Sequence, residues 1–165
     1  MVSETCLTEE ERLKTIKRIE EKLYKLSNSK LTHLEKVLER EEIRIPYIQY
    51  IGDLLGIHKV NDQLVMELGP QNYNTANVAH GGALYTFADI ALGSYIGNQL
   101  PPNKRVFTLE MKMNFIKKGV GEKLIAKPRI VQFGNRIVFG ECTIFDEEGD
   151  IVANSNGSFY ITTIK

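Results

Sequence analysis

Residues 81–99 read GGALYTFADIALGSYIGNQ, and this stretch decides the fold that the sequence predicts. Apolar side chains recur along it every three or four residues, which is typical of an α-helix with one buried face. Asn98 and the pair Pro101-Pro102 end the pattern, because proline cannot continue a helix. The stretch predicts the only long helix after residue 46.

Alternating polar and apolar residues predict strands on both sides of this helix. One strand is expected within 60–68, before the helix, and four long strands after it. The four are roughly 105–117, 122–133, 136–145 and 151–164. Their separators are Gly119 and Gly121, Gly134-Asn135, and Glu147-Glu148-Gly149, residues that favour antiparallel hairpins. Because crossover helices are missing, the pattern predicts an α+β fold with one helix laid across an antiparallel sheet.

Residues 1–45 differ in composition from the rest of the chain. They contain no Gly and no Pro but ten basic and ten acidic residues, whereas all 13 Gly and 5 Pro lie in 46–165. A boundary near Pro46 is therefore predicted, with an N-terminal helical extension before it. Thr8, followed by three glutamates, favours a helix start, and the apolar spacing predicts two amphipathic helices separated near Ser27.

The two N-terminal helices are expected to pack on the following domain or on each other across an oligomer. A DNA-binding helix-turn-helix is the alternative. Because the charges of residues 1–45 balance and no helix is strongly basic, the sequence argues against that alternative.

The whole chain has 165 residues, with 21 basic and 21 acidic side chains, so its formal net charge is zero. This length suits one compact domain with an appendage, and the neutral charge argues against nucleic acid as a partner.

No stretch approaches the ~20 apolar residues that span a bilayer. Cys6 and Cys142 lie in unlike contexts and predict no disulfide. A cytoplasmic location is expected, with no membrane partner and with Cys142 as a small core residue.

The residues that open the long helix are the first candidates for chemistry. His80, Gly81 and Gly82 predict a helix N-terminus at which the glycine N–H groups are free, with no side chain to block approach. Such donors can stabilise a carbonyl oxygen that gains negative charge. The alternative is that the glycines only allow a tight entry from loop to helix.

Asp89 is the second candidate, because a carboxylate within the apolar run F-A-D-I-A-L is costly to bury unless it is used or paired. A carboxylate satisfied by Tyr85 or Thr86 is the alternative. Gly81 and Asp89 are eight residues apart, about 12 Å along a helix. If both act on one carbonyl, the carboxylate must come from a second copy, which implies a symmetric dimer with shared sites.

These residues also carry a resemblance to a known family. The motifs are Asn74, His80-Gly81-Gly82, Asp89, Thr108-Leu109-Glu110-Met111 and Asn114-Phe115. With the C-terminal strands they resemble the hotdog-fold acyl-CoA thioesterases of the PaaI-like branch, over about residues 55–164. The resemblance implies an antiparallel sheet wrapped around a central helix, a homodimer or homotetramer, and hydrolysis of an acyl-CoA to free acid and CoA. Because the sequence has no P-loop, dinucleotide-binding or HExxH motif, we expect no cofactor and no metal, and coenzyme A enters only as part of the substrate.

The resemblance also implies roles for single residues. The N–H of Gly81 would polarise the thioester carbonyl, and Asp89 of the partner chain would activate water or attack the carbon. Asn74 would help to place the water or thioester, and His80 would shape the loop or bond the substrate. Further substrate-binding candidates are Gly82, Tyr85, Thr108, Asn114, Lys117 and Lys118. Asn77 stands where the family often has Gly, and Asn tolerates the left-handed conformation best among the other residues.

Basic residues concentrate after the helix. Residues 104–136 hold nine Lys or Arg against two Glu, a net charge of +7, which would suit the phosphates of coenzyme A. Solvent-facing lysines that protect sheet edges are the alternative explanation.

The three histidines are too scattered for a metal site, and no nucleotide-binding motif is present. A non-catalytic acyl-CoA sensor, relayed by the N-terminal helices, is the second function that the sequence allows.

Overall fold

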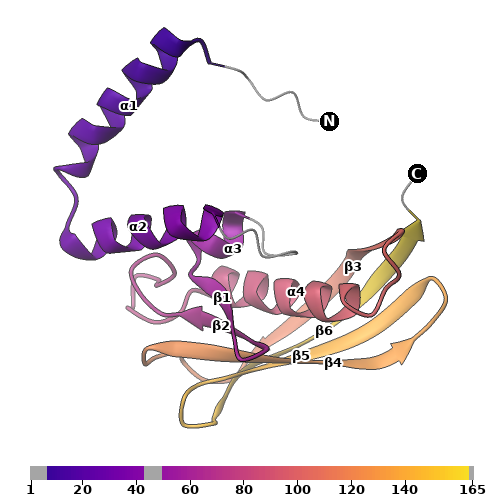
Figure 1. The fold of residues 1–165 in the computed structure, drawn as a ribbon. Helices are drawn as coiled ribbons and strands as arrows, with labels where there is room; N and C mark the ends of the chain where they lie inside the picture. Colours follow the sequence, from indigo (N-terminus) through magenta and orange to yellow (C-terminus); the bar gives the residue numbers. More distant parts are fainter. Residues whose placement is uncertain (1–6, 43–49, 164–165) are drawn as a thin grey trace. The chain divides into compact units, whose positions relative to one another are not determined.

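The computed structural model describes residues 7–42 and 50–163, with the side chains of 40–42 excepted. The chain divides into two compact units, Met1–Lys36 and Val37–Lys165, so the division falls within helix α2 (Asn28–Glu42). The boundary predicted near Pro46 lies outside the described residues. The order of the elements along the chain can be followed in Figure 1.

The N-terminal unit begins with helix α1 (Glu9–Leu23), whose start has the capping box that its sequence favours. The hydroxyl of Thr8 accepts the N–H of Glu11 at 3.3 Å, and the Glu11 carboxylate accepts the N–H of Thr8 at 2.9 Å. The hydrogen bonds that the Glu11 carboxylate accepts from the N–H and from the hydroxyl of Thr8 lower the pKa of Glu11. No residue of α1 is buried, so its apolar stripe, which includes Leu13 and Ile16, is exposed.

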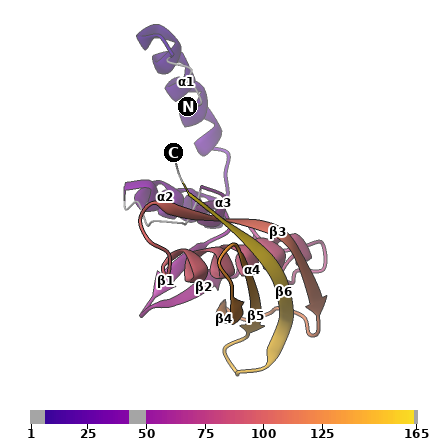
Figure 2. The ribbon, with the colours of Figure 1, turned by 90° about the vertical axis from the view of Figure 1, so that its right-hand side faces the viewer.

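The second unit contains one six-stranded antiparallel sheet and the long helix α4 (Gly81–Gly97). The remaining elements are α3 (Tyr50–Leu54), β1 (Ile57–Val60), β2 (Gln63–Glu67), β3 (Lys104–Phe115), β4 (Lys123–Phe133), β5 (Ile137–Phe145) and β6 (Ile151–Thr163). The strand order is β1-β2-β4-β5-β6-β3. Helix α4 lies across one face of the curved sheet (Figures 1 and 2). The predicted α+β fold, with a sheet around a central helix, is confirmed.

The core lies between α4 and the sheet. Phe87 and Leu92 of α4 are fully buried and belong to the same cluster as Phe159 of β6. Gly140 of β5 allows this close approach, because a Cβ there would lie 2.8 Å from Leu92 Cδ2. Cys142 is also fully buried, and burial raises the pKa of its thiol to about 12, so it is a neutral core residue as predicted.

The strand predicted within 60–68 is present as β2, but the strand β1 that pairs with it was not predicted. The sequence predicted a single strand within 60–68, but β1 and β2 pair with each other, with Val60 opposite Gln63. Asn61 and Asp62 form the turn with φ angles of 47° and 66°. Asn and Asp adopt positive φ more readily than other side chains, and this allows a two-residue turn that the alternating pattern concealed.

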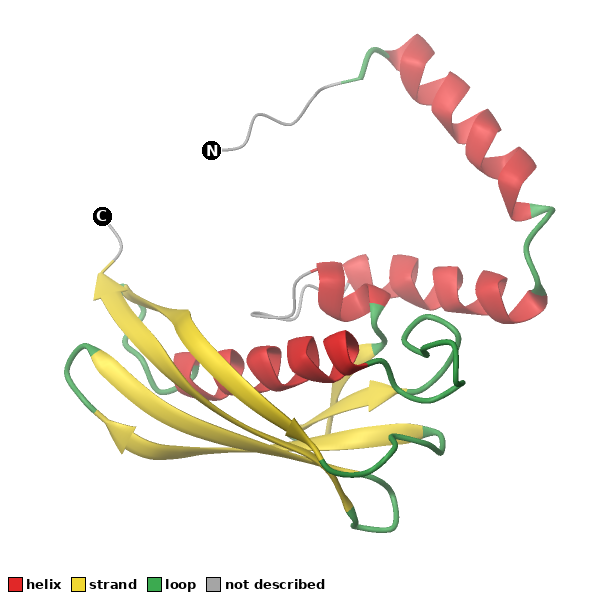
Figure 3. Cartoon of the chain, turned by 180° about the vertical axis from the view of Figure 1, so that it is seen from behind, coloured by secondary structure: helices red, strands yellow, loops and turns green. Residues whose placement is uncertain are grey.

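The prediction that the first two strands after the helix form a hairpin is wrong. Strand β3 pairs with β6, and β4 pairs with β2 and β5, so β3 and β4 are not neighbours. Residues 116–122 form a crossing segment between them, which we call the β3–β4 connection. It is fixed at its start because the N–H groups of Ile116 and Lys117 both donate to the carbonyl of Val152. Strand β3 therefore forms an edge of the sheet (Figure 3).

Within the described ranges, no helix is long and apolar enough to cross a membrane.

Candidate active site

The loop before α4 is organised by Asn74. Its side-chain oxygen accepts the N–H groups of Ala76 at 2.8 Å and Val78 at 3.4 Å, and its own N–H donates to the Val78 carbonyl at 2.9 Å. Asn77 has a φ of 56°, so it adopts the left-handed conformation for which Asn was expected to substitute for Gly. The Asn74 side chain thus folds the loop that leads directly into the helix.

His80 caps the N-terminus of α4. Its Nδ1 accepts the N–H of Gly82 at 2.9 Å, so the expectation that the Gly82 N–H is free is wrong. The N–H of Gly81 makes no hydrogen bond to any other described residue. Since Nδ1 is an acceptor, the neutral imidazole of His80 carries its proton on Nε2, and the side chain is exposed. The N–H of Gly81 therefore remains a free backbone donor at the positive end of α4.

A groove of about 370 Å³ lies beside this donor. It is lined by the loop, the start of α4 and the β3–β4 connection, and the predicted residues among its lining are Asn74, Gly81, Lys117 and Lys118. The ring of Phe115 covers Gly81 closely, because a Cβ on Gly81 would lie 3.2 Å from Phe115 Cζ. The structure thus brings four of the predicted site residues into one depression.

The two adjacent lysines in the groove differ in their surroundings. The Lys117 ammonium lies 2.5 Å from Asp150 Oδ2 and 3.3 Å from Asp146 Oδ2, and these hydrogen bonds raise the pKa of Lys117. Lys118 has no ion pair with any described residue. The sequence did not indicate these two aspartates as site residues, although it predicted Glu147-Glu148-Gly149, which lies between them, as a turn that separates two strands.

Asp89 lies elsewhere on α4, half-buried beside strand β3. Its Oδ1 accepts the hydroxyl of Thr108 at 2.7 Å, and its other oxygen has no hydrogen-bond partner among the described residues. The alternative that Tyr85 or Thr86 satisfies this carboxylate is wrong. The Tyr85 hydroxyl donates to the carbonyl of Met111, and the Thr86 hydroxyl donates to the carbonyl of Gly82 at 3.0 Å.

Six of the ten predicted site residues do not line this groove: His80, Gly82, Tyr85, Asp89, Thr108 and Asn114. Asp89 does not line it, in accord with the separation of about 12 Å from Gly81 that helix geometry requires. Asn114 precedes Phe115 in β3 and pairs with Asn154. Because side chains alternate along a strand and Phe115 faces α4, Asn114 lies on the opposite face of the sheet.

Comparison with known proteins finds a family and solved structures to which this chain is similar. Residues 76–153 match the model of the thioesterase superfamily. The crystal structure of the BH2602 protein from Bacillus halodurans with CoA superposes with a TM-score of 0.77 at 26% identity, over 88% of this chain and 99% of that one. The PaaI protein of E. coli superposes with a TM-score of 0.64 at 18% identity, over 81% of this chain and 96% of that one.

A relative from Archaeoglobus fulgidus, named "Putative esterase", is 26% identical over 148 residues, which are 88% of this chain and 82% of that protein. Over residues 76–153 the chain is similar to the thioesterase superfamily, and its fold is the hotdog fold. The resemblance inferred from His80-Gly81-Gly82 and Asp89 is confirmed at this level.

The contact between the β3–β4 connection and the loop before α4 can be tested by a pair of glycine substitutions. A Cβ on Gly119 would lie 2.8 Å from the Cβ of Ala79 and 3.2 Å from Leu124 Cδ1, whereas a Cβ on Gly93 in α4 has nothing within 4 Å. We expect Gly119→Ala to lower the free energy of unfolding by about 1–3 kcal/mol through overpacking. Gly93→Ala should raise it by about 0.5–1 kcal/mol, because alanine favours the helix.

Urea unfolding of both variants measures these two effects side by side. A Gly119→Ala protein as stable as the wild type would show that the connection is not packed on this loop.

Proposed function

We propose that the protein hydrolyses acyl-CoA thioesters to a free acid and CoA. The observation that carries the proposal is the free N–H of Gly81 at the N-terminus of α4, which opens on a groove large enough for part of a ligand. The match of residues 76–153 to the thioesterase superfamily supports a hydrolase, and the CoA in the similar Bacillus halodurans structure supports the ligand.

In the proposed reaction, the thioester carbonyl accepts a hydrogen bond from the N–H of Gly81. The oxygen gains negative charge as the carbon becomes tetrahedral, and the helix N-terminus stabilises that charge. Asp89 of the partner subunit either takes a proton from the attacking water or attacks the carbon itself. The C–S bond then breaks, and the CoA thiolate leaves and takes up a proton, which Asp89 supplies where it has acted as the base. Where Asp89 has attacked the carbon, water then hydrolyses the acyl-aspartate anhydride, which releases the free acid and restores the carboxylate. Thr108 orients the Asp89 carboxylate, while His80 and Asn74 hold the loop that presents Gly81.

The proposal requires at least a homodimer, because one protomer separates Gly81 from Asp89. Strand β3 supports such an assembly, since it is a 12-residue edge strand whose unpaired side can align with a second copy. The hydrogen bonds from Thr108 to Asp89 and from Tyr85 to Met111 hold α4 close to this edge. A symmetric pairing would therefore bring Asp89 of each chain toward the groove of the other. A tetramer would be a dimer of such dimers.

For the coenzyme A moiety we propose that Lys118 contacts phosphate, because its ammonium is not committed to a carboxylate. Apart from the CoA of the substrate, the reaction as proposed needs only water. We propose a cytoplasmic location, because a reducing compartment suits the free thiol of Cys142.

The assay that tests the proposed function measures thiol release from a short, a long and an aromatic acyl-CoA, with Asp89→Asn as the inactive control. We expect turnover of at least one of the three.

The exposed stripe of α1 favours the second candidate, a sensor that relays ligand binding through its N-terminal helices. A protein that binds all three thioesters and releases no thiol would establish the sensor and exclude the hydrolase.

A further inference from the structure

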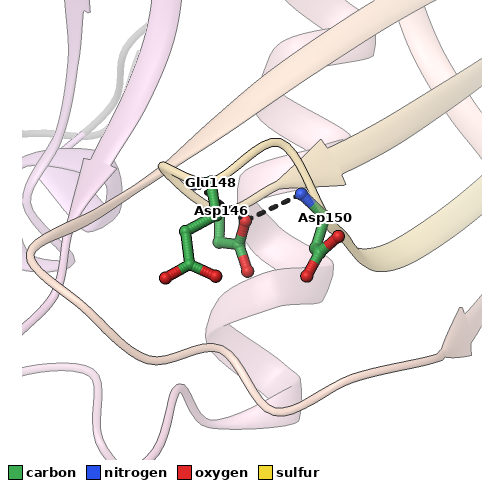
Figure 4. A group of neighbouring side chains, drawn as sticks. All are labelled: Asp146, Glu148 and Asp150. Atoms are coloured by element: carbon green, nitrogen blue, oxygen red, sulfur yellow. Dashed lines mark hydrogen bonds between the residues drawn. The ribbon is translucent and has the colours of Figure 1, made fainter.

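The turn between β5 and β6 is built around Asp146, a buried carboxylate that is only 6% exposed. Its Oδ1 accepts the N–H groups of Glu148 at 3.1 Å and Asp150 at 2.8 Å, so it fixes the shape of the turn. Its Oδ2 accepts the ammonium of Lys117 at 3.3 Å. Figure 4 shows three of the four carboxylates of this turn, those of Asp146, Glu148 and Asp150, and the hydrogen bond that the Asp150 N–H donates to Asp146.

A second carboxylate ties the same turn to the other end of the β3–β4 connection. Glu147 Oε2 accepts the N–H of Glu122 at 3.0 Å, and Glu147 Oε1 lies 3.7 Å from the ammonium of Lys123. The β5–β6 turn therefore holds the connection at both ends, through Lys117 and through residues 122–123.

The middle of the connection forms a wall of the groove. The carbonyl of Gly119 accepts the N–H of Ala79 at 2.9 Å, directly before His80 and Gly81. Gly119 is buried, and the close packing of its Cα on Ala79 leaves the connection little freedom to shift. Lys118 lies between this packed glycine and the tied Lys117, so its place in the groove is set by both neighbours.

We propose that Asp146 is a positioning residue for CoA, which acts by holding Lys117 so that Lys118 stays in the groove beside Gly81. The inference rests on the proposed function only in taking CoA as the ligand. Under this proposal the two adjacent lysines have different roles. Lys117 neutralises the acidic turn, and Lys118 binds a phosphate of CoA. The three carboxylates Asp146, Glu148 and Asp150 lie within 4.8 Å of one another, and the Lys117 ammonium supplies the positive charge between two of them.

The pKa of Asp146 is shifted in the direction that this ion pair requires. Burial alone would raise the pKa of Asp146, but the hydrogen bonds from the Asp150 N–H and the Lys117 ammonium outweigh it, and the pKa is lowered. Asp146 is thus charged at neutral pH, and the tie to Lys117 is an ion pair rather than a neutral hydrogen bond.

The test measures the Kd of CoA and of pantetheine, which lacks the nucleotide phosphates, by calorimetry. Asp146→Asn retains an oxygen for the two turn N–H groups but removes the charge opposite Lys117. We expect it to weaken CoA binding by about five- to tenfold and to leave pantetheine binding within twofold of the wild type. Glu141→Gln is the matched control, because it breaks the ion pair of Glu141 with Arg129 on the outer face of the sheet; it should change neither Kd.

A double-mutant cycle tests whether Asp146 acts through Lys118. Lys118→Ala should weaken CoA binding, and adding Asp146→Asn should weaken it no further. If Asp146→Asn fails to fold, Asp150→Asn removes the exposed partner of Lys117 and should give a smaller loss of the same kind.

Unchanged CoA binding in Asp146→Asn, equal losses for CoA and pantetheine, or additive effects in the cycle would each overturn the inference. A wild-type protein that binds CoA but releases no thiol from its thioesters would refute the hydrolase while leaving this inference intact. A wild-type protein that does not bind CoA would overturn both.

Discussion

Asp89→Asn is expected to lower kcat for the best acyl-CoA substrate by on the order of 10²-fold or more, with the Kd of CoA unchanged. The amide retains the shape of the side chain and can still accept the Thr108 hydroxyl, so the contact between α4 and β3 is preserved. It can neither take a proton from water nor attack a carbonyl. The loss should therefore appear in kcat and not in binding.

Glu110→Gln is the matched control for this experiment. Glu110 is an exposed carboxylate two residues beyond Thr108 in β3, and its partner is the hydroxyl of Ser158 on the face of the sheet away from α4. Its neutralisation should leave kcat within about twofold of the wild type. An Asp89→Asn protein that retains its turnover would remove Asp89 from the mechanism.

Two inactive variants are expected to restore activity when they share a dimer. Gly81→Val would place its Cβ 3.2 Å from Phe115 Cζ and its methyl groups beside the free N–H, so access to that donor should be lost. Alone, Gly81→Val and Asp89→Asn should each have at most about one hundredth of wild-type activity. In a heterodimer, however, one site combines Gly81 of the Asp89→Asn chain with Asp89 of the Gly81→Val chain.

The size of the recovery follows from symmetry. Random pairing of equal amounts makes half of the dimers mixed, and each mixed dimer has one intact site of two, so about a quarter of wild-type activity should return. Co-expression with two different tags, followed by purification on both, enriches the mixed dimer and should raise the recovery to about one half. No recovery in a verified heterodimer would show that each site draws both groups from a single chain.

Most of the fold could be predicted because its signals are local. The spacing in residues 81–99 sets the buried face of α4, and the alternation in the four C-terminal segments sets their strands. The pairing of these strands is not local. The glycines at 119 and 121 are compatible both with a hairpin and with a crossing segment, and the choice depends on Val152 and Ala79, which bond that segment from distant parts of the chain.

The candidate site was predictable to a similar extent. The His-Gly-Gly start of α4 and Asp89 follow from residue types in an apolar context, and the left-handed Asn77 follows from its conformational preference. The use of the Gly82 N–H by the His80 ring was missed, because a histidine cap depends on a rotamer. The partner of Asp89 was missed because Thr108 is 19 residues away in another element.

The open side of β3 has a consequence for the behaviour of the purified protein. In the proposed dimer, a strand of 12 residues with unsatisfied main-chain groups would gain its missing hydrogen bonds from a second copy, and mass action would then link folding to assembly. The melting temperature would therefore rise with protein concentration, and dilution would lower both the stability of the fold and the catalytic activity.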